Sequence, residues 1–182
     1  MSKLFVDEIV HQSSQGSGTI TIGASGEKVD LGTGVSQGTL TNTPAFRATQ
    51  NSNQTIPTNA FTKLVLDVEQ KDTNSAYDTS NYRFTVPTGY AGQYFFSAQY
   101  RLSGLGDQDV PQILFYKNGG LDNNGRIIGT MGVGENFTHN VTYTMECSVG
   151  DYFEVYVFHN YGSNRDTSAS YCNFQGFRLI GT

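Results

Sequence analysis

Segments that alternate between apolar and polar residues, each bounded by turn residues, restrict this chain to an all-β fold. The longest alternation covers residues 92–102, where Tyr94 and Phe96 stand on one face of a strand and Phe95 on the other. Shorter segments that read as strands lie at 61–68, 82–86, 111–116, 140–149, 153–157 and 171–180. Turn residues end or separate them at Pro87, Asn118-Gly119, Asn124-Gly125 and Gly150-Asp151. No amphipathic helix of useful length interrupts the series, which therefore predicts a β sandwich or jelly roll.

Composition excludes two classes of partner. The chain of 182 residues carries 11 Lys and Arg against 16 Asp and Glu, a net charge of −5. It has no basic stripe that could neutralise phosphates, so we expect no nucleic-acid binding. No stretch approaches 18 apolar residues, so we expect no membrane insertion.

The first residues and the cysteines bear on the compartment. Asp7 and Glu8 stand where a secretory signal would need apolar residues, so we expect the protein to fold in a cytoplasm. In that compartment Cys147 and Cys172 are expected to be reduced core residues. A disulfide between neighbouring strands is the alternative.

Several motifs could carry chemistry, but each departs from the pattern that the chemistry requires. Residues 34–38 match the G-x-S-x-G pattern but lack the strand and helix that a nucleophile elbow requires. His11, His139 and His159 have no metal-ligand spacing. Residues 122–125 resemble the start of a calcium loop, but Met131 stands where the bidentate Glu should be. With no carboxylate pair either, we predict no catalytic, cofactor or metal site and no enzyme activity.

Motifs spread over residues 45–182 together resemble the C1q/TNF-like domain. They are, in order, Ala45-Phe46, Tyr77-Asp78, Phe84-Thr85-x-Pro87, Gly92-x-Tyr94-x-Phe96, Asn118-Gly119, Gly150-Asp151 and Phe174-x-Gly176-Phe177-x-Leu179. The resemblance implies a trimerising jelly roll over 45–182. It also implies that strand 92–102 and the closing strand contribute to the trimer axis, through Tyr94, Phe96 and Phe177. A strand that is apolar on both faces supports this, because both faces should then be covered.

Residues 1–44 differ from the rest of the chain. They are poor in aromatic residues and form at most a short extended β segment, too small to bury a core of its own. The opening, with Ile20-Thr21-Ile22-Gly23 and Val29-Asp30-Leu31-Gly32, resembles that of fibre and appendage proteins of tailed bacteriophages. This resemblance implies that residues 1–44 attach the chain to another virion protein. It implies a virion structural protein, a trimeric tail fibre or a head fibre or knob, assembled in the host cytoplasm.

Other functions stay open beside this one. A C1q/TNF-like secreted or surface ligand would share the fold, although the chain lacks a collagen Gly-X-Y stalk; a glycan depolymerase would need a carboxylate pair. A host-surface glycan or protein could bind at polar and aromatic loops, for which 105–108, 121–124 and 161–166 are candidates. Within the last loop we single out Tyr161, Asn164 and Asp166. The alternative is that these loops are solvated turns and that the role is purely structural.

Overall fold

The computed structural model describes residues 43–104, 106, 109–130 and 136–179, all within one compact unit, Leu40–Thr182. The predicted attachment segment, residues 1–44, lies outside the described residues except for its last two. Its boundary with the jelly-roll domain stays a prediction. Residues 34–38 also lie outside the described residues, so the prediction that they form no nucleophile elbow is not tested either.

Strands make up most of the described chain. They are β1 (Ala45–Thr49), β2 (Thr55–Ile56), β3 (Thr62–Lys63), β4 (Val68–Asp72), β5 (Tyr77–Asp78), β6 (Arg83–Thr85), β7 (Gly92–Leu102), β8 (Gln112–Lys117), β9 (Gly120–Ile128), β10 (Phe137–Cys147), β11 (Tyr152–Phe158), β12 (Arg165–Asp166) and β13 (Asn173–Arg178). One 3-10 turn, η1 (Ala169–Tyr171), precedes the last strand. The predicted all-β class is confirmed.

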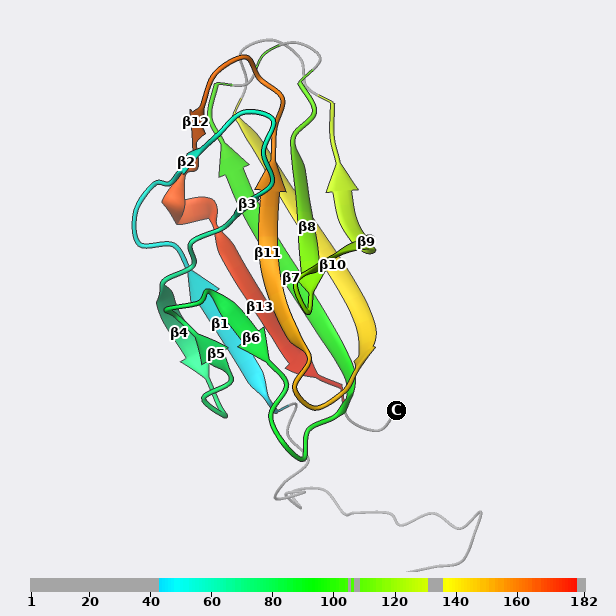
Figure 1. The fold of residues 1–182 in the computed structure, drawn as a ribbon. Helices are drawn as coiled ribbons and strands as arrows, with labels where there is room; N and C mark the ends of the chain where they lie inside the picture. Colours follow the sequence, from blue (N-terminus) through cyan, green and yellow to red (C-terminus); the bar gives the residue numbers. More distant parts are fainter. Residues whose placement is uncertain (1–42, 105, 107–108, 131–135, 180–182) are drawn as a thin grey trace, which may run out of the picture. The chain divides into compact units, whose positions relative to one another are not determined.

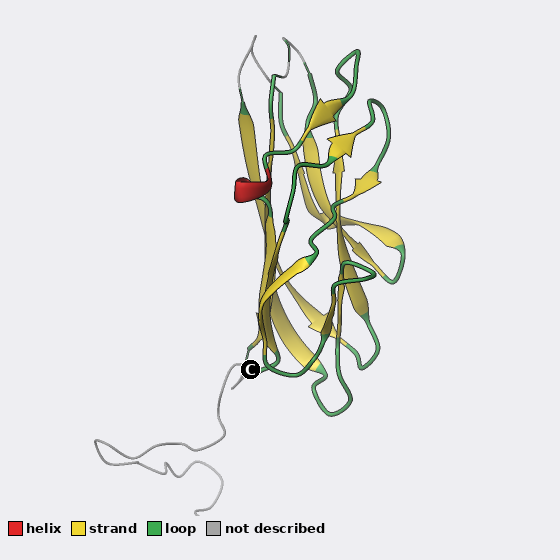
Figure 2. Ribbon diagram, turned by 90° about the vertical axis from the view of Figure 1, so that its left-hand side faces the viewer, coloured by secondary structure: helices red, strands yellow, loops and turns green. Residues whose placement is uncertain are grey.

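Two antiparallel sheets pack face to face as a jelly-roll sandwich (Figures 1 and 2). The first, called here the β7 sheet, has the strand order β10-β7-β13-β1-β4. The second, the β11 sheet, has the order β5-β6-β11-β8-β9, with β3 paired to β11. A short ladder joins β12 to β2. The chain passes repeatedly from one sheet to the other: β4, β7 and β10 of the β7 sheet are each followed by a strand of the β11 sheet.

Aromatic side chains fill the space between the sheets. Phe96 on β7 is fully buried, and its ring centre lies 4.5 Å from that of Phe153 on β11. Phe46 on β1 stacks on Phe84 of β6 at the same distance. Burying a side chain of this size contributes about 1.5–3 kcal/mol. These ring pairs therefore hold the two layers together.

Two of the predicted turn motifs contact each other. Asn118 and Gly119 have φ angles of 53° and 78°, which a tight β8–β9 hairpin requires. The Asn118 amide donates to the carboxylate of Asp151 (2.8 Å) and accepts from the backbone N–H of Tyr152 (2.9 Å). This contact ties the β8–β9 hairpin to the turn before β11.

Two strand predictions were wrong in part. The single strand expected over 61–68 is interrupted: β3 ends at Lys63 and β4 begins at Val68, although Leu64 and Leu66 between them are buried as expected. Asn124-Gly125 is not a turn but lies inside β9, where the register with β8 shifts. Gly125 packs so closely on Phe115 that a Cβ there would lie 2.9 Å from the ring.

Candidate functional site

An aromatic pair marks the outward face of the β7 sheet. Because Tyr94 and Phe96 point into the core, Phe95 between them points out. Phe177 of β13 lies directly opposite Phe95, with ring centres 5.4 Å apart. Ala45 of β1 is the next residue across the sheet. These three side chains form an apolar row that the core does not cover.

A hollow of about 480 Å³ opens beside this row. It is lined by Phe95 and Phe177 and by the polar side chains of Arg47, Lys71 and Gln175. We call it the interface hollow. It lies on the face of a flat sheet, where a second molecule has direct access.

Two cations border the interface hollow without a counter-charge. Arg47 of β1 and Lys71 of β4 are directly opposite each other, and both are exposed. Among the described residues neither side chain has a hydrogen bond or an ion pair. Like charges in this position destabilise a pair of strands. An acidic group from another molecule would relieve the repulsion.

The rest of this face is polar. The Asn140 amide donates to the Ser97 hydroxyl (3.3 Å), and the Gln99 amide donates to the Tyr171 carbonyl (3.1 Å). The Arg101 guanidinium lies 4.4 Å above the ring of Tyr171. Among the described residues, the apolar row of this face therefore lies at the end near Phe95.

The residues predicted for the trimer interface fall in two different environments. Phe177 lines the interface hollow, and its place in a trimer interface stays a prediction. Tyr94 and Phe96 are fully buried inside their own chain, and the Tyr94 hydroxyl donates to the Tyr90 carbonyl (2.7 Å). Neither has surface left for direct contact with another chain, so their contribution to an interface is to support the sheet behind it. The hollow is also lined by Phe95, Arg47 and Lys71, none of which the sequence had singled out for the interface.

The predicted receptor loop is more constrained than expected. The ring of Tyr161 is half-buried and lies under the Arg165 guanidinium at 3.6 Å, so that face of the ring is not free to stack on a sugar. Asp166 belongs to β12 and accepts a hydrogen bond from Thr55 (2.7 Å). Asn164 is exposed.

The two other candidate loops give less support for a receptor-binding surface. In 105–108 only Gly106 is described. Residues 121–124 lie on β9, where the Asp122 carboxylate accepts a hydrogen bond from the backbone N–H of Asn124 (2.9 Å).

The buried histidines and cysteines do not form a metal site. Within the described ranges no three His, Cys, Asp or Glu side chains come together. His139 is buried on β10, and burial lowers the pKa of its imidazole to about 4. Cys147 and Cys172 are both buried and free. A search of the same ranges finds no helix with the length and apolar character of a membrane span.

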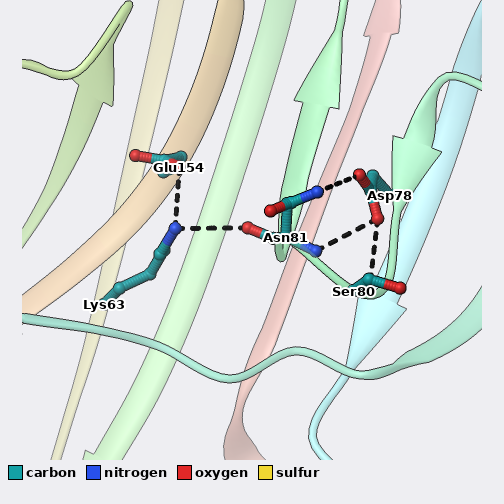
Figure 3. A network of polar contacts seen from close by, with 5 residues as sticks. All are labelled: Lys63, Asp78, Ser80, Asn81 and Glu154. Carbon is teal, nitrogen blue, oxygen red and sulfur yellow. Dashed lines mark hydrogen bonds and ion pairs between the residues drawn. The ribbon is translucent and has the colours of Figure 1, made fainter.

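A polar network fixes the outer side of the β11 sheet (Figure 3). The Lys63 ammonium pairs with the Glu154 carboxylate (2.9 Å) and donates to the Asn81 carbonyl (3.3 Å). Asp78 accepts from the Asn81 amide (2.6 Å) and from the backbone N–H of Ser80 (2.8 Å). The Asn81 amide is the main cause that lowers the pKa of Asp78. Each group already has its partner, so this network stabilises the β5–β6 turn.

Comparison with known proteins places the fold. No family model and no curated protein matches the chain. The globular domain of a zebrafish complement 1qA protein is similar in structure, with a TM-score of 0.55 and 14% identity over 75% of this chain and 97% of that one. The described domain has a C1q/TNF-like jelly-roll fold.

Two further structures agree with this fold. The Eiger TNF of S. frugiperda has a TM-score of 0.55 and 10% identity, covering 76% of this chain and 93% of that one. Murine APRIL has a TM-score of 0.56 and 12% identity, covering 74% and 98%. At such identities the likeness extends to the fold alone.

Proposed function

We propose that this chain is a structural protein of a bacteriophage virion, a homotrimeric tail fibre or head fibre whose jelly-roll domain is displayed for attachment to a host surface. The observation that carries the trimer is the interface hollow, where an uncovered aromatic pair adjoins the unneutralised Arg47 and Lys71. An exposed apolar patch marks a contact surface, and in the proposed trimer a neighbouring chain covers this one. The resemblance of residues 1–44 to phage appendage proteins supports the virion.

A closed ring of three chains needs two different surfaces on each chain, because the contact is head-to-tail. The interface hollow is one. Edge strand β9 offers the other: Leu121, Ile127 and Ile128 are exposed there, and Asp122 beside them carries a carboxylate. An apolar edge with an acid complements an apolar hollow bordered by cations.

Light scattering of the full chain tests the trimer. We expect the mass of three chains at micromolar concentration, and Phe177→Ser should reduce it to that of one chain. Tyr171→Ser is the matched control, because Tyr171 is an exposed aromatic residue outside the interface hollow. A stable wild-type monomer would refute the trimer.

Mass spectrometry of purified virions tests the other half of the proposal. Peptides of this chain should be present in particles of the phage that carries its gene. The second candidate, a C1q/TNF-like secreted or surface ligand, is favoured by the fold. It would be absent from particles and present in the medium or at the cell surface.

A further inference from the structure

The outward face of the β11 sheet carries a row of aromatic side chains that the core does not use. Phe153, Val155 and Val157 point into the core, so Tyr156 and Phe158 on the same strand point out. Tyr156 stacks on Tyr116 of β8 with ring centres 3.9 Å apart. Phe158 contacts Phe61 at 4.9 Å. The two ring pairs lie on a rigid sheet.

Phe61 is the accessible end of this row. Its side chain is 42% exposed, whereas Leu114, at an outward position opposite Tyr156, is fully buried. Other side chains therefore cover Leu114, whereas the Phe61 ring remains open to solvent. Together with Phe158, Tyr156 and Tyr116 the Phe61 ring extends a contiguous apolar surface, and a contiguous exposed patch of this kind marks a contact surface.

Hydrogen-bond donors are fixed beside the Phe61 ring. The side-chain oxygen Oε1 of Gln112 accepts hydrogen bonds from Nε (3.1 Å) and Nη2 (2.5 Å) of Arg126, which fixes both side chains. The Arg126 guanidinium carbon lies 5.9 Å from the Phe61 ring centre. Among the described residues no group accepts from the Gln112 amide nitrogen, and no carboxylate pairs with Arg126. Phe61, Gln112, Arg126 and Phe158 are called the Phe61 patch.

The free polar groups of the Phe61 patch are all donors. The nearby carboxylate, Glu154, is already paired with Lys63 (Figure 3). A matching ligand must therefore be rich in acceptors, and a guanidinium binds a carboxylate best. It must also present a flat apolar face to the ring. A pyranose with a carboxylate at C6 has both properties.

We propose that the Phe61 patch binds an acidic glycan built of uronic acid residues. The sugar ring stacks on Phe61, and its carboxylate accepts hydrogen bonds from Arg126 and from the Gln112 amide. This site deepens the attachment role proposed above, yet it is complete within one chain. A trimer would display three copies and gain affinity for a repetitive polysaccharide through multivalency.

Calorimetric titration of the full chain with two matched sugars tests the site. The probes are β-1,4-linked hexaglucuronate and cellohexaose, which differ in oxidation at C6 only. Hexaglucuronate should bind with a Kd below about 1 mM, and cellohexaose at least tenfold more weakly. Equal binding of the two would overturn the role of the carboxylate, and no binding of hexaglucuronate up to about 10 mM would overturn the site.

Variants locate the binding. Phe61→Ala and the isosteric Gln112→Glu should each weaken hexaglucuronate binding at least tenfold, because the first removes the ring and the second places a carboxylate against the ligand. Tyr171→Ala is the control: Tyr171 is 44% exposed and also lies under an arginine, but it belongs to η1, away from the β11 sheet. The Tyr171→Ala variant should bind hexaglucuronate as tightly as the wild type does. Unchanged binding in Phe61→Ala would refute the site.

Two further measurements separate the alternatives. Hexaglutamate, titrated in the same way, should bind weakly; affinity equal to that of hexaglucuronate would replace the glycan by an acidic peptide. Light scattering on the same samples gives the oligomeric state. A monomer that binds hexaglucuronate would support the Phe61 patch and refute the trimer, so the two proposals fail separately.

Discussion

Lowering the pH should destabilise the domain through His139. This side chain is 5% exposed, and its ring lies edge-on to Phe137 with centres 4.0 Å apart. Gly129 packs against it, since a Cβ at Gly129 would lie 2.4 Å from Nε2. No described group accepts from or donates to Nδ1. A proton on this imidazole would leave a charge without a partner in an apolar site.

The size of the effect follows from the pKa. Burial lowers the pKa of His139 from 6.5 to about 4, so the folded protein favours the neutral imidazole. Its contribution to stability is therefore fully present above pH 6.5 and is lost as the pH falls from 6.5 to 4. Each pH unit in that interval removes about 1.4 kcal/mol. Between pH 6.5 and 5 the free energy of unfolding should fall by about 2 kcal/mol from this residue alone.

Urea unfolding of the wild type and of His139→Leu, each at pH 7 and pH 5, isolates the effect. Other titrating groups are common to both proteins, so the difference between the two pH losses reports on His139. The variant should lose about 2 kcal/mol less than the wild type on acidification. Equal losses in both proteins would refute the reasoning, whatever the absolute stabilities.

Three further predictions concern the fold and its attachment. Phe96→Ala should lower the free energy of unfolding by about 3–5 kcal/mol in urea titration, and a loss under about 1 kcal/mol would contradict its central place in the core. Gly176→Ala would put a Cβ 2.6 Å from the Phe96 ring and 2.8 Å from the Phe95 carbonyl oxygen. It should cost about 1–3 kcal/mol, which an unchanged thermal midpoint would exclude. Removing residues 1–44 should leave a soluble trimer that no longer enters particles; aggregation would instead make the segment part of the fold.

Periodicity in the sequence was sufficient for the architecture but not for the contacts between strands. The alternation over 92–102 became β7 with the same bounds, and it correctly separates Phe95 from Tyr94 and Phe96. The residues Tyr94, Phe96, Tyr100 and Leu102 make one face clearly the more apolar, and that face is the core. What periodicity could not show is that Phe95, alone among polar residues on the other face, pairs with Phe177, because that contact joins strands that are distant in sequence. Had that register been known, Phe95 would have replaced Tyr94 and Phe96 as an interface candidate.

Tertiary contacts also explain what the turn residues could not predict. Asn124-Gly125 has the composition of a hairpin turn, yet Gly125 is needed within β9 so that Phe115 and Tyr143 can approach. The Phe61 patch had no sequence signal. Phe61 meets Phe158 and Arg126 only because β3 joins β11, and β8 joins β9, in one sheet.

The alternation of β7 links correct folding to assembly. In the proposed trimer, core and interface residues are neighbours on one strand, Phe96 inside and Phe95 outside. A slip of β7 by one residue against β13 would move every side chain to the opposite face. Phe95 would enter the core, and the hydroxyl-bearing ring of Tyr94 would face outward, no longer matched to Phe177. A chain with that error would present the wrong surface to its partners, so association itself would select the correctly registered chains from the misfolded ones.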